Sequence, residues 1–340
     1  MPVIRIVRLM AGILGMAAAL LAAPAGAQET RSYILTTATT GGTYYPVGVA
    51  LATLIKIKLE PKDKISMSAI SSAGSGENVK LLREKEAQFA IIQGVFGAWA
   101  WNGTGKLKDS GPQPNMRSVS MLWQNVEHFI IRTEDVKTGT VDDLKLLKGE
   151  KFSIGARNSG TEGSGRHILG GLGIDPDSSF DIAYMGYNPT AEAMMNGNIE
   201  GANLPGGVPV GAITQLFANL GDKVTILGFT EDQITRANAG FKLWTPYVIP
   251  ADSYPGQSKE VHTIAQPNFL AVNDDVPEED VYKITKTIYE NLAFLNNIHK
   301  ATTVMDISKA IAGLPAPLHP GAARYYRDVG ITIPDHLIAK

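Results

Sequence analysis

The chain has 340 residues, a formal net charge of −2 at pH 7 and no cysteine. A slightly acidic chain without basic blocks gives no support for nucleic acid or an anionic membrane as a partner. Without cysteine there is no disulfide, no thiol nucleophile and no thiolate metal site. Stability must therefore come from apolar cores, and a chain of this length can build two lobes.

The N-terminus has the layout of a secretory signal peptide. Arg5 and Arg8 precede an apolar run over 9–23, and a small-residue cleavage site ends at Ala27. The run is shorter than the ~18–20 residues that a membrane span needs. We therefore expect residues 1–27 to be removed, which takes away two arginines and leaves a net charge of −4. The mature protein is expected to reach the periplasm without inserting into the membrane.

The first candidate binding motif lies between a predicted strand over 33–38 and a predicted helix over 47–59. The strand is rich in β-branched and aromatic residues, and apolar residues recur at helical spacing in the helix. The turn over 39–46 reads Thr-Thr-Gly-Gly-Thr-Tyr-Tyr-Pro, where glycines let a ligand approach the backbone closely. The free amides of the helix N-terminus, with the Thr43 hydroxyl, suit an anionic group. An ordinary strand-to-helix turn is the alternative.

The same arrangement recurs in the next segment. Residues 65–70 alternate at period two and predict a strand, which leads through a Gly/Ser loop into a helix over 77–83. Ser75 is the expected N-cap of that helix. A further strand over 89–92 ends at Gln93. Glycine, proline and charged residues then predict an exposed loop over 102–116.

A third copy follows a predicted crossing strand. Residues 118–132 are extended and are expected to pass from one lobe to the other. A short helix is predicted over 142–148. A strand over 151–154 then enters a Gly/Ser loop, and a helix continues from 160 to 172.

The rest of the chain continues this alternation, which is typical of α/β architecture. The segment 245–258 is predicted to be irregular, 262–273 to be a returning crossing strand, and 277–297 to be one long helix. The other predicted strands are 181–185, 199–204 and 224–227, and the other predicted helices are 189–196, 205–220 and 230–239.

With these segments placed, the sequence resembles the TAXI family of solute-binding receptors for TRAP transporters over about residues 32 to 330. The motifs that carry the resemblance occur in order at 40–48, 72–78, 93, 159–161, 206–209, 254–257, 279–285 and 319–326. The resemblance implies a two-lobed periplasmic-binding-protein fold of type II, with the ligand in a cleft between lobes joined by two crossing strands. It also implies a small carboxylate ligand, an amino acid such as glutamate or a dicarboxylate or keto acid, delivered to a TRAP-type permease.

We expect lobe 1 to comprise 28–125 with 268–340, and lobe 2 to comprise 126–267. The Gly/Ser/Thr loops follow strands, and ligands of open α/β sheets bind outside the carboxyl ends of the strands. The expected ligand-binding residues are Gly42, Thr43, Tyr44, Tyr45, Ser75, Asn78, Gln93, Arg157, Ser159, Gly160, Thr161, Gly206 and Gly207.

Several of these residues have structural alternatives. Tyr45 is either a wall of the pocket or a core aromatic residue. Asn78 and Gln93 either bind the ligand or satisfy local backbone groups. Arg157, which departs from the family pattern, either clamps a second carboxylate or is a solvated surface residue.

Enzyme motifs are missing from the sequence. It contains no G-x-S-x-G, G-x-G-x-x-G or G-x-x-x-x-G-K-[ST] motif, and its six histidines have no metal-ligand spacing. We therefore expect a monomeric binding protein without metal, cofactor or catalytic residues. The alternatives are an exported hydrolase with Ser75 or Ser159 as nucleophile, and a binding protein for an ABC importer or a sensor.

Overall fold

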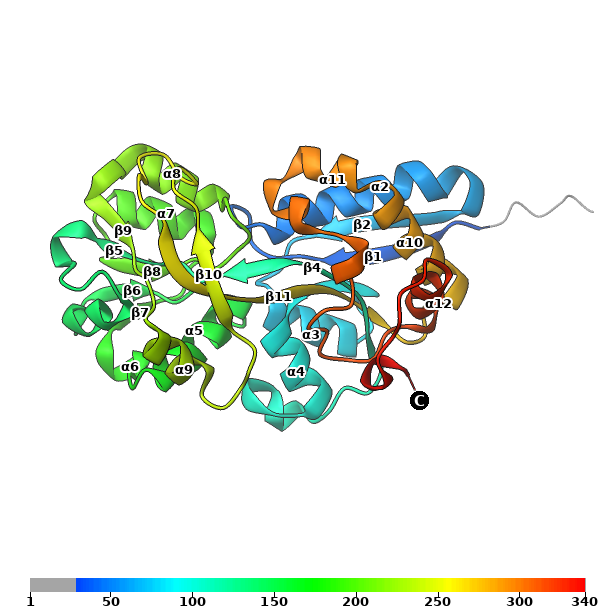
Figure 1. Cartoon of the computed structure of the whole chain (residues 1–340), viewed down its shortest axis with the longest axis horizontal. Helices are drawn as coiled ribbons and strands as arrows, with labels where there is room; N and C mark the ends of the chain where they lie inside the picture. The colour runs from blue at the N-terminus through cyan, green and yellow to red at the C-terminus, as the bar shows by residue number, and fades with distance from the viewer. Residues whose placement is uncertain (1–28, 340) are drawn as a thin grey trace, which may run out of the picture.

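Two β-sheets, one in each lobe, organise the computed structural model, which describes residues 29–339 (Figure 1). The expected signal peptide lies outside the described residues. The first sheet, which is centred in lobe 1 and extends along β11 toward lobe 2, has the order β10 (Thr245–Ile249), β11 (Val261–Asn273), β3 (Phe89–Gln93), β1 (Arg31–Thr36) and β2 (Ile65–Ile70), with β4 (Met116–Val126) beside β11. The sheet of lobe 2 has the order β7 (Asp181–Ala183), β6 (Lys151–Ser153), β8 (Gly201–Asn203), β5 (Phe129–Arg132) and β9 (Val224–Ile226).

Parallel strands β1, β2 and β3 form the part of the first sheet that leads to the site. β1 pairs with β2 from Arg31 opposite Ile65 to Thr36 opposite Ile70, and with β3 at its carboxyl end. Every residue of β3 is buried, which is typical of a central parallel strand covered on both faces. Because these strands are parallel, the loops that follow them emerge at the same edge.

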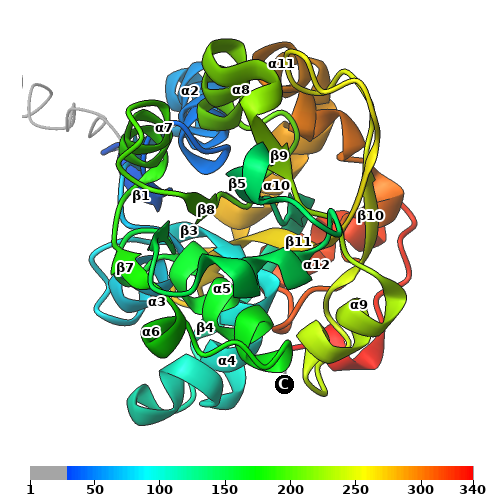
Figure 2. The same ribbon diagram turned by 90° about the vertical axis from the view of Figure 1, so that its left-hand side faces the viewer.

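Helices cover both faces of each sheet. In lobe 1, one face carries α2 (Tyr44–Asp63), α10 (Glu278–Glu290) and α11 (Leu292–Ile298), and the other carries α3 (Ser75–Arg83) and α4 (Gly94–Asn102), while α12 (Pro320–Asp328) packs on α10 (Figure 1). In lobe 2, α7 (Tyr187–Met195) and α8 (Gly211–Leu220) lie on one face, and α5 (Gly160–Gly171), α6 (Pro176–Ser179) and α9 (Glu231–Asn238) on the other (Figure 2). Buried apolar residues on these helices build the two cores.

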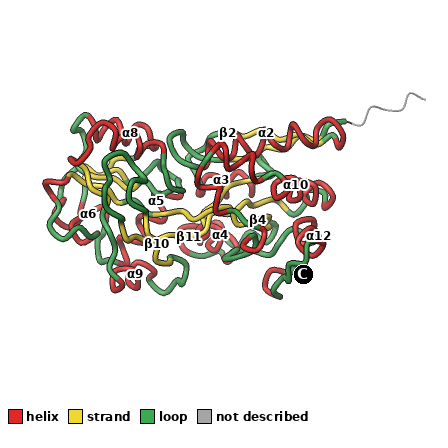
Figure 3. Tube along the Cα trace, turned by 45° about the horizontal axis from the view of Figure 1, so that its top comes forward, coloured by secondary structure: helices red, strands yellow, loops and turns green. Residues whose placement is uncertain are grey.

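The two lobes are joined by β4 and β11, as expected for crossing strands. These long strands are antiparallel neighbours, from Ala265 opposite Val126 to Asn273 opposite Met116. Only Glu127 and His128 separate β4 from β5 of the second sheet. Strands can be followed from one lobe into the other through the middle of the molecule (Figure 3).

Four sequence-based expectations are corrected by the structure. Ser75 is the first residue of α3, and Gly74 is its N-cap, with φ 124°. The segment predicted to be irregular contains β10, which tolerates Pro246 because an edge strand has one unpaired side. The long helix predicted over 277–297 breaks at Asn291. The helix predicted over 142–148 is a 3₁₀ helix, Val141–Leu147.

Short 3₁₀ helices also connect the main elements; they are Gly105–Ser110, Thr133–Asp135, Gly221–Lys223, Lys300–Val304, Ile307–Lys309 and Asp335–Leu337. Among the helices of residues 29–339, none combines the length and the apolar character that crossing a membrane requires.

Candidate functional site

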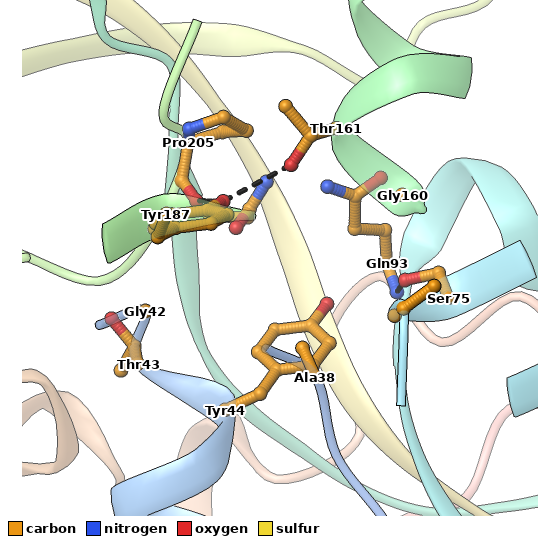
Figure 4. Close-up of a pocket in the computed structure, with 14 residues that line it drawn as sticks. Ala38, Gly42, Thr43, Tyr44, Ser75, Gln93, Gly160, Thr161, Tyr187 and Pro205 are labelled. Carbon is orange, nitrogen blue, oxygen red and sulfur yellow. Dashed lines mark hydrogen bonds between the residues drawn. The ribbon is translucent and has the colours of Figure 1, made fainter. Parts of the chain in front are cut away.

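A small pocket lies between the two lobes (Figure 4). Its walls come from the β1–α2 loop, the N-termini of α2, α3 and α5, the end of β3, the crossing strand β4, and the start of α7 with the loop after β8. The lining residues are Ala38, Gly42, Thr43, Tyr44, Ala73, Gly74, Ser75, Gln93, Asn125, Gly160, Thr161, Tyr187, Pro205 and Gly206.

Most of the residues expected to bind a ligand meet in this pocket. Those that line it are Gly42, Thr43, Tyr44, Ser75, Gln93, Gly160, Thr161 and Gly206. Sequence reasoning missed Asn125 and Tyr187, the two other lining residues with hydrogen-bonding side chains. Tyr187 begins a helix after a strand, which is the same position that drew attention to Thr43, so that signal was present in the sequence.

The N-termini of three helices line the pocket: α2 and α3 belong to lobe 1, and α5 belongs to lobe 2. The first backbone amides of α2, α3 and α5 have no acceptor within their own helices. Ser159 caps α5 through a 3.0 Å bond from the Glu162 amide, which leaves the Gly160 and Thr161 amides at the pocket. A Cβ on Gly160 would lie 2.8 Å from both Gln93 Cδ and Ser75 Oγ, so only glycine lets α5 approach α3 this closely. The site therefore combines converging N–H donors with the positive ends of helix dipoles.

Two tyrosine hydroxyls are fixed in the walls of the pocket. Tyr44 Oη donates to Asn268 Oδ1 at 2.5 Å. Tyr187 Oη donates to the carbonyl of Pro205 and lies 3.1 Å from Thr161 Oγ1 (Figure 4). Burial raises the pKa of both phenols well above the usual value, so both remain neutral hydroxyls.

Two amide side chains contribute polar atoms that the protein itself leaves unpaired. Gln93 and Asn125 are 3% and 1% exposed. Gln93 Oε1 and Asn125 Nδ2 have no hydrogen-bond partner among the described residues. Residues 29–339 contain nine other such atoms outside the pocket lining, so the lack of a partner does not by itself identify a ligand contact.

The lobes are held closed around the pocket. Thr43 Oγ1 donates to the carbonyl of Gly207 at 3.0 Å and accepts from its amide at 3.1 Å. Elsewhere between the lobes, Lys106 Nζ of lobe 1 lies 2.6 Å from Glu162 Oε2 of lobe 2. Backbone hydrogen bonds across the cleft also join Glu77 to Asn158 and Ala212 to Gly41.

The other expected ligand-binding residues lie outside the pocket. Asn78 is fully buried, and its amide donates to the carbonyls of Thr37 and Ile91 at 2.7 and 2.8 Å, so it ties strands together. Arg157 is exposed, and its guanidinium lies 3.7 Å from the centre of the Tyr184 ring.

Three more of the expected ligand-binding residues do not line the pocket, and two of them have identifiable structural roles. Tyr45 is half-buried in the first turn of α2 and does not line the pocket. Ser159 is the cap of α5, and Gly207 serves as the cross-lobe partner of Thr43.

The pocket has no charged side chain in its lining. None of its lining residues is acidic, basic or a histidine. The connection between β4 and β5 contains one acidic side chain that is fully buried, that of Glu127. Its Oε1 accepts from Trp244 Nε1 at 3.3 Å and its Oε2 from Asn203 Nδ2 at 3.0 Å. Burial raises the pKa of Glu127 to about 7.

The described residues show no catalytic arrangement around the two candidate nucleophiles. Ser75 Oγ accepts from the Gln93 amide at 3.0 Å, and Ser159 Oγ is engaged as a helix cap. No hydrogen bond of residues 29–339 joins either serine to a histidine. Within the same residues, no three His, Asp or Glu side chains cluster as metal ligands would.

Comparisons with solved structures and with a family model identify the fold and the family of this chain. The chain is similar to MatC from Rhodopseudomonas palustris with bound malate, at 13% identity and a TM-score of 0.56, covering 88% of this chain and 99% of that one. It is also similar to the periplasmic binding protein BugD, at 12% identity and a TM-score of 0.54, covering 89% and 94%. These similarities show the fold, and the expected two-lobed α/β binding-protein fold of type II is confirmed. The model of the NMT1-like family matches residues 35–330, and the chain therefore belongs to the NMT1-like family.

Proposed function

We propose that the mature protein is a periplasmic solute-binding receptor that captures a small carboxylate between its lobes and delivers it to a TRAP-type secondary transporter. The observation that carries this proposal is the convergence of three helix N-termini from both lobes on one pocket. Such amides bind an anion without needing a full counter-ion.

The chemistry of the lining favours a carboxylate. The amides of Ser75, Gly160 and Thr161 come from two helices of opposite lobes, and both helices lead away from the pocket. A carboxylate has two oxygens that accept several hydrogen bonds, so one group can engage both lobes. An anion bound there would draw the lobes together, which is the geometry that the cross-lobe contacts of Thr43 already display.

The lobes that close on the ligand are proposed to be 28–125 with 268–340, and 126–267. With this division, the chain passes from one lobe to the other within β4 and again within β11, and these two strands are paired. Two connections that lie side by side define one hinge, so the lobes open and close as rigid bodies. A monomer with one cleft is sufficient for this action.

The transporter class is supported by the sequence motifs found in order between residues 32 and 330, which resemble those of TAXI receptors. The malate bound to MatC is itself a small carboxylate on the same fold. We propose that the protein is no enzyme and uses no metal or cofactor, because Ser75 and Ser159 serve structural hydrogen bonds. Service to an ABC importer or a sensor is the alternative.

A paired glycine substitution tests the proposed site. In Gly160→Ala the new methyl group would collide with Gln93 and Ser75, so lobe closure and ligand affinity should fall at least 10-fold. Gly170→Ala is the matched control, because a Cβ at that position of the same helix meets nothing within 4 Å. Mass spectrometry of the molecule that co-purifies with the protein, followed by calorimetry with that molecule, measures the effect. Equal affinity of the two variants, or turnover of the bound molecule, would overturn the proposal.

The transporter partner needs a separate test. Uptake of the ligand into vesicles that contain the candidate permease should require this protein and an ion gradient. Uptake that instead requires ATP hydrolysis would assign the protein to an ABC importer.

A further inference from the structure

The charges and donors around the pocket restrict its ligand further than to small carboxylates in general. We infer, on the basis of the proposed function, that the ligand is a carboxylic acid without an amino group, and that the side-chain amide of Gln93 sets this preference. Amino acids, including the glutamate that the sequence motifs leave open, are then excluded.

No negative charge is available in the lining to balance an ammonium group. Of the residues that line the pocket, all within the described part of the chain, none is aspartate or glutamate. The N-termini of α2, α3 and α5 instead present the positive ends of three helix dipoles, which attract an anion and repel a cation. Burying an ammonium without a counter-charge costs more free energy than its hydrogen bonds return. The pocket can therefore compensate the carboxylate of an amino acid but not its ammonium.

The buried acid of the hinge does not supply the missing charge. Glu127 is not a lining residue, and its carboxylate oxygens already accept from Trp244 Nε1 at 3.3 Å and from Asn203 Nδ2 at 3.0 Å. Burial also raises the pKa of Glu127 to about 7, so the carboxyl stays neutral over the acidic range. An ammonium in the pocket thus has no carboxylate to contact.

Most side-chain oxygens of the lining already accept a hydrogen bond within the protein. Those that do are Thr43 Oγ1, Ser75 Oγ, Asn125 Oδ1 and Tyr187 Oη. Tyr187 Oη accepts from Thr161 Oγ1 because its own proton goes to the carbonyl of Pro205. Thr161 Oγ1 and Tyr44 Oη, which both donate, keep lone pairs. Two neutral hydroxyl oxygens are thus left for the three N–H groups of an ammonium.

The Gln93 side chain turns a donor toward the pocket. A Cβ on Gly160 would lie 2.8 Å from Gln93 Oε1, so this oxygen faces the N-terminus of α5. The backbone amide of Gly160 has no acceptor within its own helix, and its N–H favours this orientation of the oxygen. Gln93 Nε2 points the other way, toward Tyr187 across the pocket, and donates to no group among residues 29–339 (Figure 4). It is therefore available to an oxygen of the ligand.

An amide donor at this position separates acids from amino acids. Gln93 Nε2 can donate to a carboxylate, oxo or hydroxyl oxygen, but an ammonium has no lone pair with which to accept. An ammonium beside Nε2 would set N–H groups against N–H groups, in addition to lacking a counter-charge. Acids with an oxo group, a hydroxyl group or no substituent all remain compatible with the lining.

Pairs of probes that differ in the amino group test this inference by calorimetry on the ligand-free protein. The pairs are pyruvate and alanine, 4-methyl-2-oxopentanoate and leucine, and 2-oxoglutarate and glutamate. In the pair that fits the pocket, the oxo acid should bind about 100-fold more tightly than the amino acid. The molecule that co-purifies with the protein should fail to react with an amine-specific reagent. An amino acid that binds as tightly as its oxo acid, or an amine in the co-purified molecule, overturns the inference.

Substitutions of Gln93 test its role in the preference. Gln93→Glu replaces Nε2 by a carboxylate oxygen, which repels an acid and supplies the counter-charge that an ammonium needs. The preference for the oxo acid should therefore fall about 10-fold or more. Gln93→Met only removes the donor, so it should weaken the oxo acid without strengthening the amino acid.

Gln215→Glu is the matched control, because it adds the same charge at an exposed position of α8 and should leave the preference unchanged. An unchanged preference in Gln93→Glu, with a native circular dichroism spectrum, overturns the role of Gln93. If Gln93→Glu does not fold, Gln93→Met and the wild-type ranking decide.

The outcomes also distinguish this inference from the proposed function. Amino acid binding that is lost in Gly160→Ala but kept in Gly170→Ala supports the receptor and overturns only the exclusion of the amino group. If no carboxylate binds and Gly160→Ala matches Gly170→Ala, the proposed site fails, and the inference fails with it.

Discussion

Replacing Glu127 by glutamine should make the protein more stable at alkaline pH. Glu127 is fully buried in the hinge, and no salt bridge of residues 29–339 includes it. Burial disfavours its charged form and raises its pKa from 4.5 to about 7. Glutamine has the shape of the neutral acid but never ionises. Asn203 can offer its otherwise unpaired Oδ1 to the new amide.

The sign of the effect follows from proton binding. Between pH 4.5 and 7 the folded protein holds the Glu127 proton while the unfolded chain has lost it, so the free energy of unfolding falls as pH rises. At about 1.4 kcal/mol per pKa unit, the full cost above pH 7 is about 3 kcal/mol. Between pH 5 and pH 8 the wild type should therefore lose about 2.5 kcal/mol relative to Glu127→Gln.

His128 acts in the opposite direction in the same hinge. Burial lowers its pKa from 6.5 to about 4, so the unfolded chain binds the proton first and stability is lost as pH falls from 6.5 toward 4. The two neighbouring groups partly offset each other in the wild type. Removing the Glu127 contribution should leave a variant whose stability decreases on acidification.

Urea unfolding followed by circular dichroism at pH 5, 6, 7 and 8 measures the difference between wild type and variant. Glu134→Gln is the control, since Glu134 is exposed and forms no salt bridge among the described residues, so its substitution should leave the pH profile unchanged. If the difference between wild type and Glu127→Gln is the same at every pH, Glu127 is not held neutral by burial.

Three further predictions concern lobe closure. Thr43→Val leaves the amide and carbonyl of Gly207 unpaired in the closed form, so affinity for the co-purifying ligand should fall by about 1–2 kcal/mol in calorimetry; unchanged affinity would mean that this contact does not stabilise closure. Lys106→Ala removes the ion pair with Glu162, so ligand release in stopped-flow fluorescence should become a few-fold faster at low salt and converge with wild type at high salt; the absence of any difference would remove the pair from the closing contacts. Arg157→Ala should leave affinity unchanged in the same calorimetry, and a loss of 10-fold or more would place Arg157 in the binding site.

The parts of the fold that the sequence predicted are those set by local periodicity. Residues 65–69 alternate between apolar and polar side chains, and β2 spans the predicted residues 65–70, with Ile65 and Met67 buried. β10 was missed because its prolines argue against a strand, and only its edge position in the assembled sheet makes Pro246 tolerable. The break at Asn291 was missed because the apolar spacing continues across it into α11.

The candidate site divides in a similar way. Thr43, Ser75 and Thr161 were predictable because loops after strands and before helices lie at the carboxyl edges of the two sheets, and these edges face the same pocket. Asn125 was not, because it lies within a strand and reaches the pocket only through the packing of β4 on β11. Asn78 carries the same amide group as Gln93, but it donates to the backbone carbonyls of Thr37 and Ile91. Sequence spacing alone does not show whether an amide side chain faces the pocket or binds the backbone.

The paired crossing strands restrict what the molecule can do once it is empty. Since β4 and β11 form a hydrogen-bonded ladder, neither connection can lengthen or slip alone without breaking its pairing with the other. The backbone freedom of the N-terminal crossover is thus confined to the dipeptide Glu127–His128, whose side chains are both buried. Because few backbone torsions can change in this connection, few relative orientations of the lobes are accessible, and a ligand that bridges the lobes selects among them.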